Sequence, residues 1–135
     1  MSLAITQQAI LRWHQMLAQR DMQLLNELLA DDVVFRSPVA FQPYASKAVV
    51  FFILSNVIEI FEDFHYLREF YSADGCNVVL EFAAHVGEKQ LKGIDMIRFN
   101  SEGQIVEFEV MLRPKSGLEA LALQMGQRLA AFQTP

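Results

Sequence analysis

The first quarter of the chain has the hydrophobic spacing of two helices. Within residues 5–19, Ile10, Trp13 and Leu17 recur every three or four positions, which is typical of an amphipathic helix. Asp21 is placed to cap a second, short helix. The buried stripe of that second helix, which ends near Asp31 and Asp32, is expected to consist of Leu24, Leu25, Leu28 and Leu29.

A short strand and a strongly apolar helix are expected next. Residues 33–35 have the composition of a strand, which stops at Pro38. Ser46 precedes a helix over residues 47–61 that has few polar positions. Because almost every face of this helix is apolar, we expect it to be covered on most sides.

The second half of the chain predicts a sheet and a final helix. Four strand-like segments follow one another, near residues 64–73, 76–87, 90–99 and 104–112. Short turn-forming links between them favour antiparallel hairpins over helical crossovers. A Ser-x-x-Glu capping box at Ser116 predicts a last helix to about residue 132. The sequence therefore predicts one α+β domain over residues 1–135, with helices on one face of a curved antiparallel sheet and a cavity on the concave side.

Composition and charge narrow the function classes. The chain has 135 residues and 53% of them are hydrophobic, which indicates a lined cavity or a subunit interface, and we expect a homodimer. The longest apolar run, residues 48–54, is far shorter than a membrane-spanning helix. No secretory signal is recognised, so a cytoplasmic location and no membrane partner are expected. The net charge of -5 and the scattered basic residues argue against a nucleic-acid partner.

Asp95 is the residue that most needs an explanation. Side-chain alternation places it on the same strand face as Ile97 and Phe99. A carboxyl group on an apolar face is costly unless it is neutralised, paired or used. We therefore expect burial to raise the pKa of Asp95, and the protonated acid to donate a hydrogen bond to a ligand. The alternative is a structural carboxylate bonded to backbone or to a buried water.

The next strand supports an apolar inner face. If the turn joins residues 99 and 104, Phe108 lies opposite Asp95 and is flanked by Val106 and Val110. In the same register Ile105 belongs to the outer face. Both strands then agree that Asp95 points toward apolar neighbours.

Histidine and cysteine do not indicate a metal site or a cofactor. His85 faces away from the expected pocket by parity, an assignment that a β-bulge would reverse. His14 and His65 lie too far from it in sequence to give a metal-ligand spacing. Cys76 is the only cysteine, so it has no partner for an internal disulfide. No metal and no cofactor are expected.

Two stretches of the chain resemble a known superfamily. Residues 28–38 and 94–106, in their order among the elements, look like the nuclear transport factor 2-like superfamily over about residues 4–112. The chain resembles the ketosteroid isomerase-like and polyketide cyclase-like branch, and residues 113–121 are similar to the tail of an uncharacterised bacterial subgroup. The resemblance implies a cone-shaped sheet around a hydrophobic pocket.

The resemblance also implies roles for three residues. Ketosteroid isomerases use an aspartate base and an oxyanion hole made of a tyrosine and a protonated aspartic acid. The protonated acid corresponds to Asp95, the tyrosine to Trp13 and the base to Ser37. Trp13 offers only an N–H donor, and the Ser37 hydroxyl is too weak a base at neutral pH. A positioned base is worth about 100- to 10,000-fold in rate, so this pattern argues against standard steroid isomerisation.

Two function hypotheses follow. The first is a protein that binds a small apolar organic ligand and isomerises or cyclises a carbonyl compound, with Asp95 as catalytic acid or hydrogen-bond donor. The alternative is a non-catalytic homodimeric binding or protein-interaction module, whose vestigial pocket is filled by its own side chains. The final helix either closes the pocket mouth or docks on a partner subunit. The ligand-binding residues of the first hypothesis are expected to be Trp13, Ser37, Ile97, Phe99, Phe108 and Val110.

Overall fold

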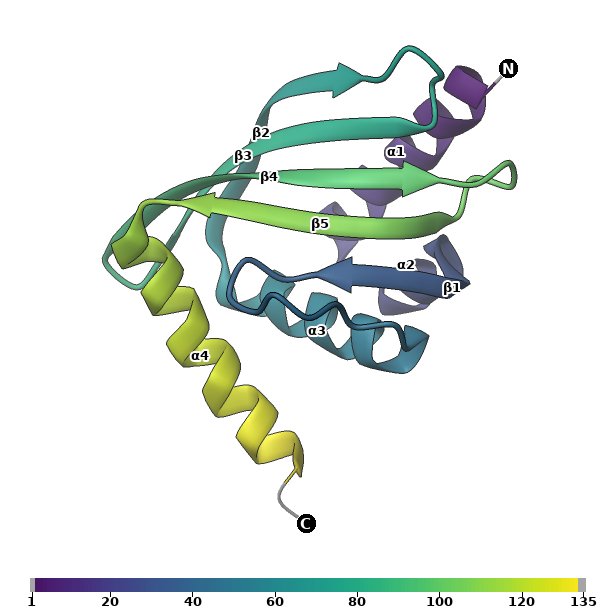
Figure 1. The fold of residues 1–135 in the computed structure, drawn as a ribbon. Helices are drawn as coiled ribbons and strands as arrows, with labels where there is room; N and C mark the ends of the chain where they lie inside the picture. The colour runs from purple at the N-terminus through teal and green to yellow at the C-terminus, as the bar shows by residue number, and fades with distance from the viewer. Residues whose placement is uncertain (1, 134–135) are drawn as a thin grey trace.

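A computed structural model describes residues 2–133, which form helices packed on one curved sheet (Figure 1). None of the helices in this described part is long and apolar enough to cross a membrane. The elements are, in order, α1 (Ser2–Gln19), α2 (Met22–Leu28), β1 (Leu29–Arg36), α3 (Lys47–Ile60), β2 (Glu62–Tyr71), β3 (Asn77–Val86), β4 (Lys89–Phe99), β5 (Ile105–Arg113) and α4 (Lys115–Gln133).

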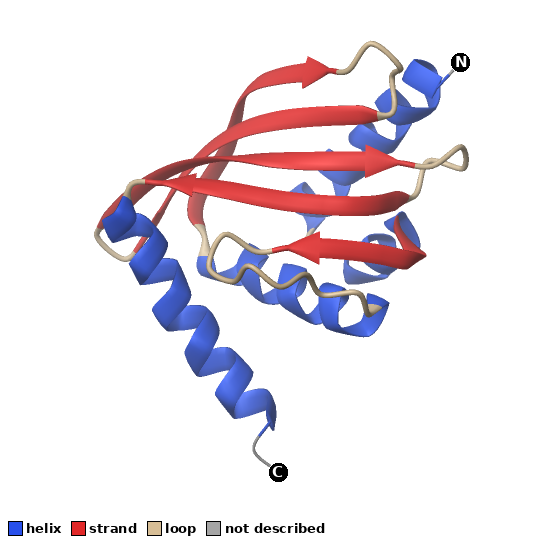
Figure 2. Ribbon diagram, in the orientation of Figure 1, coloured by secondary structure: helices blue, strands red, loops and turns tan. Residues whose placement is uncertain are grey.

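The sheet has the strand order β1-β5-β4-β3-β2. The four strands β2 to β5 pair in antiparallel fashion, as predicted, and β1 is added at one edge parallel to β5. Figure 2 shows the strands bending together as one layer, with α1, α2 and α3 gathered along one side of it. α4 leaves the end of β5 and contacts β4, β5 and α3. The predicted α+β class, the curved sheet and the additional C-terminal helix are confirmed.

Two helix caps are present, and the one at Asp21 was predicted. The Asp21 carboxylate accepts a hydrogen bond from the backbone N–H of Leu24 at 3.1 Å and so starts α2. Ser46 does the same for α3 by accepting from the N–H of Val49 at 3.4 Å. The exit of α2 differs from the prediction, because Leu29 adopts extended backbone angles and pairs with Ile105 of β5. The first strand therefore begins at Leu29, and that leucine is buried by the sheet instead of by the helix.

The start of α4 also differs by one residue. The helix begins at Lys115, so Ser116 lies inside its first turn, where Leu118 N–H donates to the carbonyl of Pro114 at 3.0 Å. The predicted capping box at Ser116 is therefore not the helix start. The predicted helix itself is present.

A β-bulge changes the register between β4 and β5. Arg98 pairs with Glu107 but Phe99 pairs with Ile105, so Val106 is an extra residue on β5. Asp95 lies opposite Val110 and not opposite Phe108, because the turn pairs Phe99 with Ile105 instead of residue 104 and the bulge adds one further residue. The bulge also turns Ile105 to the inner face, where it is fully buried, which corrects its predicted outer position.

Gly93 allows an aromatic side chain to pack directly on β4. A Cβ atom at Gly93 would lie 2.6 Å from Cζ of Phe82 and 2.5 Å from the carbonyl oxygen of Met111. Phe82 is fully buried, and its ring contacts the rings of Phe61 and Phe64 at centroid distances of 5.6 and 4.9 Å. Gly93, two residues before Asp95, therefore leaves the space in which the Phe82 ring packs.

We expect Gly93→Ala to lower the free energy of unfolding by about 1 to 3 kcal/mol, because the added methyl group meets backbone and a packed ring. Gly126→Ala is the matched control, since it lies within α4 and has no atom within 4 Å of the new Cβ. The control is expected to raise stability by up to about 1 kcal/mol. Urea denaturation measures both changes, and equal effects of the two variants would contradict this account of Gly93.

Candidate functional site

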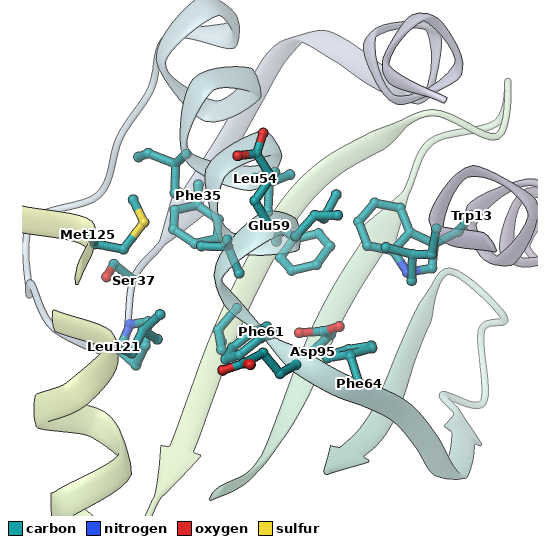
Figure 3. Close-up of a pocket in the computed structure, with 18 of the residues that line it drawn as sticks. Trp13, Phe35, Ser37, Leu54, Glu59, Phe61, Phe64, Asp95, Leu121 and Met125 are labelled. Carbon is teal, nitrogen blue, oxygen red and sulfur yellow. The ribbon is translucent and has the colours of Figure 1, made fainter. Parts of the chain in front are cut away.

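The inner face of the sheet, α1, α3 and α4 enclose a cavity of about 470 Å³. Asp95 lies in its wall with only 5% of its surface exposed (Figure 3). The wall around this carboxyl group is largely apolar, with Phe35, Leu54 and Phe61 among its residues. The predicted inward orientation of Asp95 is confirmed, because the carboxyl group belongs to the cavity and not to the solvent.

A chain of hydrogen bonds leads to Asp95 from two other elements. The indole Nε1–H of Trp13 on α1 donates to the hydroxyl oxygen of Tyr66 on β2 at 2.9 Å. The Tyr66 hydroxyl in turn donates to Oδ2 of Asp95 at 2.6 Å. Because Trp13 has only a donor, the chain runs in one direction, from Trp13 through Tyr66 to Asp95.

Aromatic packing holds the two donors of this chain. Trp13 is buried, and its ring lies 5.2 Å from that of Phe108. The ring of Tyr66 meets Phe64 edge-on at 4.9 Å and His14 at 5.3 Å. With both rings packed, the two hydrogen bonds are positioned before any ligand enters.

Burial governs the protonation of Asp95. Desolvation disfavours the ionised carboxylate and raises its pKa to about 7, although the hydrogen bond from Tyr66 acts in the opposite direction. The pKa of Tyr66 is raised well above its usual value, first by burial and then by the negative charge of Asp95. Tyr66 therefore stays neutral, and Asp95 is the member of the chain that changes charge near neutral pH.

The geometry gives protonated Asp95 one free donor. Because Oδ2 accepts from Tyr66, the proton of the neutral acid resides on Oδ1. Among residues 2–133 no protein group is bonded to Oδ1, and this oxygen is not sealed in the core. The neutral form thus offers an O–H donor to an acceptor in the cavity, and the ionised form offers a lone pair instead.

The other residues singled out from the sequence divide into two groups. Trp13, Ser37, Phe108 and Val110 line the cavity. Ser37 is not activated by a base, because its Oγ accepts a hydrogen bond from the backbone N–H of Val39 at 3.1 Å.

Ile97 and Phe99 do not line the cavity and lie in the core farther along β4, with 1% and 2% of their surfaces exposed. The structure therefore does not bring these two residues to the cavity with the other four. They share the strand face of Asp95, but side chains from the neighbouring elements fill the space over this end of the strand.

Tyr66 is the functional candidate that the sequence reasoning missed. The resemblance placed the tyrosine role on Trp13, whereas the structure puts a tyrosine between Trp13 and Asp95. One signal was present in the sequence: Phe64 and Tyr66 are aromatic residues at alternate positions, so they share a face of β2. That pattern is weak, since most of β2 is exposed and its pairing with β3 contains two register shifts.

His85 lies outside the cavity, as parity predicted. Its Nε2 is 2.9 Å from an oxygen of Asp63, and its Nδ1 is 2.8 Å from the carbonyl of Gly87. These two acceptors raise the pKa of His85, with the Asp63 contact as the larger cause. Asp63 lines the cavity together with Glu59 and Glu62, so one part of the wall is acidic. Within residues 2–133 no group of three or more His, Cys, Asp or Glu side chains is arranged to hold a metal ion.

Comparison with known proteins agrees with this architecture. A family model described as a SnoaL-like domain matches residues 10–108. The crystal structure of a steroid delta-isomerase from Pseudomonas aeruginosa is 55% identical, with a TM-score of 0.92, and the match covers 96% of this chain and 94% of that chain. An uncharacterised protein with a cystatin-like fold from Silicibacter pomeroyi DSS-3 is 34% identical, with a TM-score of 0.84 and coverage of 90% and 85%.

A more distant structure agrees in fold alone. It is a protein of unknown function, similar to nuclear transport factor 2, from Mesorhizobium loti, with 17% identity, a TM-score of 0.72 and coverage of 84% of this chain and 95% of that chain. No curated protein matches the sequence. Together the matches confirm the resemblance to the nuclear transport factor 2-like superfamily.

The raised pKa of Asp95 has a consequence for stability. The folded protein holds this proton up to about pH 7 whereas an ordinary aspartic acid loses it near 3.8, so stability falls as pH rises between these values and is level above them. The loss amounts to about 4 kcal/mol at roughly 1.4 kcal/mol per pKa unit. We expect Asp95→Asn to remove this slope and to be more stable than the wild type at pH 8. Denaturation across the pH range measures it.

Asp32→Asn provides the control for that comparison, because Asp32 is exposed. It is expected to leave the pH profile unchanged. A constant stability difference between wild type and Asp95→Asn at every pH would contradict a shifted carboxyl group.

Tyr66→Phe tests the hydrogen-bond chain itself. The Tyr66 hydroxyl lowers the pKa of Asp95, so its removal is expected to move that pKa upward from about 7. NMR titration of the Asp95 carboxyl carbon measures the change. Tyr71→Phe removes a hydroxyl that donates to Glu69 at 2.7 Å and should leave Asp95 unaffected. A downward shift in Tyr66→Phe would mean that the bond to Tyr66 is absent in solution.

Proposed function

We propose a function for this chain, which belongs to the SnoaL-like domain family. It binds a small neutral ketone with a largely apolar skeleton and activates the carbonyl group of that ketone through Asp95. One observation carries the proposal: the buried carboxyl group ends a one-directional hydrogen-bond chain inside an apolar cavity. At neutral pH that arrangement leaves one donor for one acceptor on the ligand.

The size and polarity of the cavity support a small organic ligand. Its volume of about 470 Å³ lies in the range of ordinary ligand sites, and its wall combines many apolar side chains with few polar ones. An anionic ligand is disfavoured, because the carboxyl groups of Glu59, Glu62, Asp63 and Asp95 outnumber the one guanidinium group, that of Arg20, among the lining side chains. A neutral ligand with a single strong acceptor fits this wall.

The chemistry of the donor suggests proton transfer next to a carbonyl group. When a ketone loses a proton from the carbon beside its carbonyl, negative charge develops on the oxygen. A hydrogen bond from Asp95 to that oxygen strengthens as the charge grows, so it stabilises the transition state more than the ground state. Isomerisation of an unsaturated ketone is a reaction of this kind. The 55% identical protein described as a steroid delta-isomerase supports this reaction class.

The serine at position 37 implies that the proposed isomerisation is slow. No carboxylate occupies the position that the resemblance assigns to the base, and the Ser37 hydroxyl is engaged with Val39. The chain should therefore isomerise a ketosteroid more slowly, by about 100- to 10,000-fold, than an enzyme with a positioned base.

The alternative function is less well supported. A vestigial pocket was expected to be filled by its own side chains, whereas a cavity of about 470 Å³ is present. A homodimer and a cytoplasmic location stay predictions from the sequence. Exposed apolar side chains on β2, β4 and β5, namely Phe70, Met96 and Met111, favour an interface independently of the pocket.

The binding proposal is tested with Prodan, a neutral naphthyl ketone whose emission moves to shorter wavelength in apolar surroundings. We expect the wild type to bind it below pH 7 and to lose affinity about tenfold per pH unit above the pKa of Asp95, about 7, where the donor is lost. Asp95→Asn retains an N–H donor and should bind without this pH dependence. Asp95→Leu has no donor and should bind weakly at every pH.

The same variants test the reaction. Conversion of a β,γ-unsaturated ketosteroid to its conjugated isomer is followed by ultraviolet absorbance. The wild-type rate is expected to be low but above that of Asp95→Leu, and to fall above pH 7 with the Asp95 proton. Equal Prodan affinity of wild type and Asp95→Leu would refute the binding role. Equal isomerisation rates of wild type and Asp95→Leu would refute the catalytic role of Asp95 but not its role in binding.

A further inference from the structure

α4 contributes to the cavity although it lies outside the part of the chain that the family model matches. The model covers residues 10–108, and α4 spans Lys115–Gln133. Leu121, Met125 and Leu129 recur every four residues along α4, and all three line the cavity. Figure 3 shows Leu121 and Met125 at one side of the pocket and Trp13 at the other, with Asp95 between them in this view.

The first turn of α4 is fixed against the sheet. Gly117 is buried there, and a Cβ atom at this position would lie 2.8 Å from Cβ of Leu91 and 3.1 Å from the carbonyl oxygen of Gln90. A larger residue would push the helix away from β4. The absence of a side chain at Gly117 therefore sets how closely α4 approaches the sheet.

The last turns of α4 are fixed against α3. Nη1 of Arg128 lies 2.8 Å from Oε2 of Glu59 and 2.9 Å from Oδ1 of Asn56. The Asn56 amide is itself held, because its Nδ2–H₂ donates to the carbonyl of Phe52 at 2.8 Å. α4 therefore contacts the rest of the protein near both of its ends, and a ligand that extends in this direction meets the helix.

Met125 lies between these contacts, in the middle of the inward stripe. It is 7% exposed, whereas Leu123 on the opposite side of the helix is 65% exposed. The Met125 side chain is unbranched and apolar. Its truncation at Cβ therefore enlarges the cavity without changing the charge or polarity of the wall.

We infer that α4 sets the upper limit on ligand length and that Met125 is the specificity-determining residue of that wall. The ligand class is a neutral ketone whose apolar end reaches α4 while its oxygen meets Asp95. This inference rests on the proposed function, since it assumes that the cavity holds such a ketone.

The experiment compares Prodan with its shorter acetyl and longer hexanoyl homologues, which share one chromophore. The measured quantity is the affinity for the hexanoyl homologue divided by the affinity for the acetyl homologue. We expect this ratio to be at least about tenfold higher in Met125→Ala than in the wild type, because the added space allows about two further methylene groups to be buried. Whichever end of the ketone lies against α4, the longer homologue gains from the added space. Leu123→Ala is the matched control, and its ratio is expected to stay within about twofold of wild type.

A second variant covers the case in which Met125→Ala does not fold. Met125→Trp fills the cavity next to α4 and is expected to reduce binding of the hexanoyl homologue more than that of the acetyl homologue. Wild-type ratios in both Met125 variants would overturn the inference while leaving the proposed function intact. If the wild type binds none of the three ketones, the proposed function itself fails.

Discussion

The site depends on one constraint, which is that a carboxyl group is held away from water beside a hydroxyl group that must donate to it. Burial raises the pKa of Asp95 to about 7, and Tyr66 can satisfy only one of its two oxygens. The second oxygen is not sealed in the core, so its hydrogen-bond partner is supplied by whatever occupies the cavity, water or ligand. The protein thus carries an unfavourable group that a ligand with the right acceptor improves. A residue of this kind reduces stability, and proteins tolerate such a cost mainly where it serves function.

Strand geometry determines which side chains share this environment. Alternation along β4 places Asp95 on the concave face, and Gly93 leaves the space beside it to Phe82. The pairing of Phe99 with Ile105 and the bulge at Val106 together decide which residue of β5 lies opposite, so Val110, and not Phe108, is paired with Asp95. Phe108 still reaches the site, because it packs on Trp13 and so holds the first donor of the hydrogen-bond chain. A small irregularity in one strand therefore affects the hydrogen-bond chain through aromatic packing.

The sequence predicted the features that arise from local spacing. The helices, the cap at Asp21 and the inward position of Asp95 depend on residues a few positions apart, and the structure contains them. Features that require distant strands to be aligned were missed. Tyr66 lies 29 residues from Asp95, and its contact depends on the register of β2 with β3, which shifts twice.

Ile97 and Phe99 also show that contacts between distant elements limit prediction from the sequence. Parity placed them correctly on the face of Asp95, and both are buried. Parity does not say how far along a strand a cavity extends, because that is decided by side chains from other elements. A face of a strand can be predicted from sequence, whereas the part of that face left open depends on packing in three dimensions.

Polar contacts and cavity shape have different roles in selecting a ligand, because the hydrogen-bond chain leaves a single donor at Asp95. Tyr66 is committed to Asp95, and Trp13 is committed to Tyr66, so neither is free to read a second group on the ligand. A single hydrogen bond distinguishes a ketone from a hydrocarbon, but it hardly distinguishes one ketone from another. Among ketones without a second polar group, discrimination then comes from the apolar walls, through the space that a ligand fills. α4 contributes three side chains to those walls and lies outside the matched family region, so the shape of the cavity depends partly on residues that the family model does not cover.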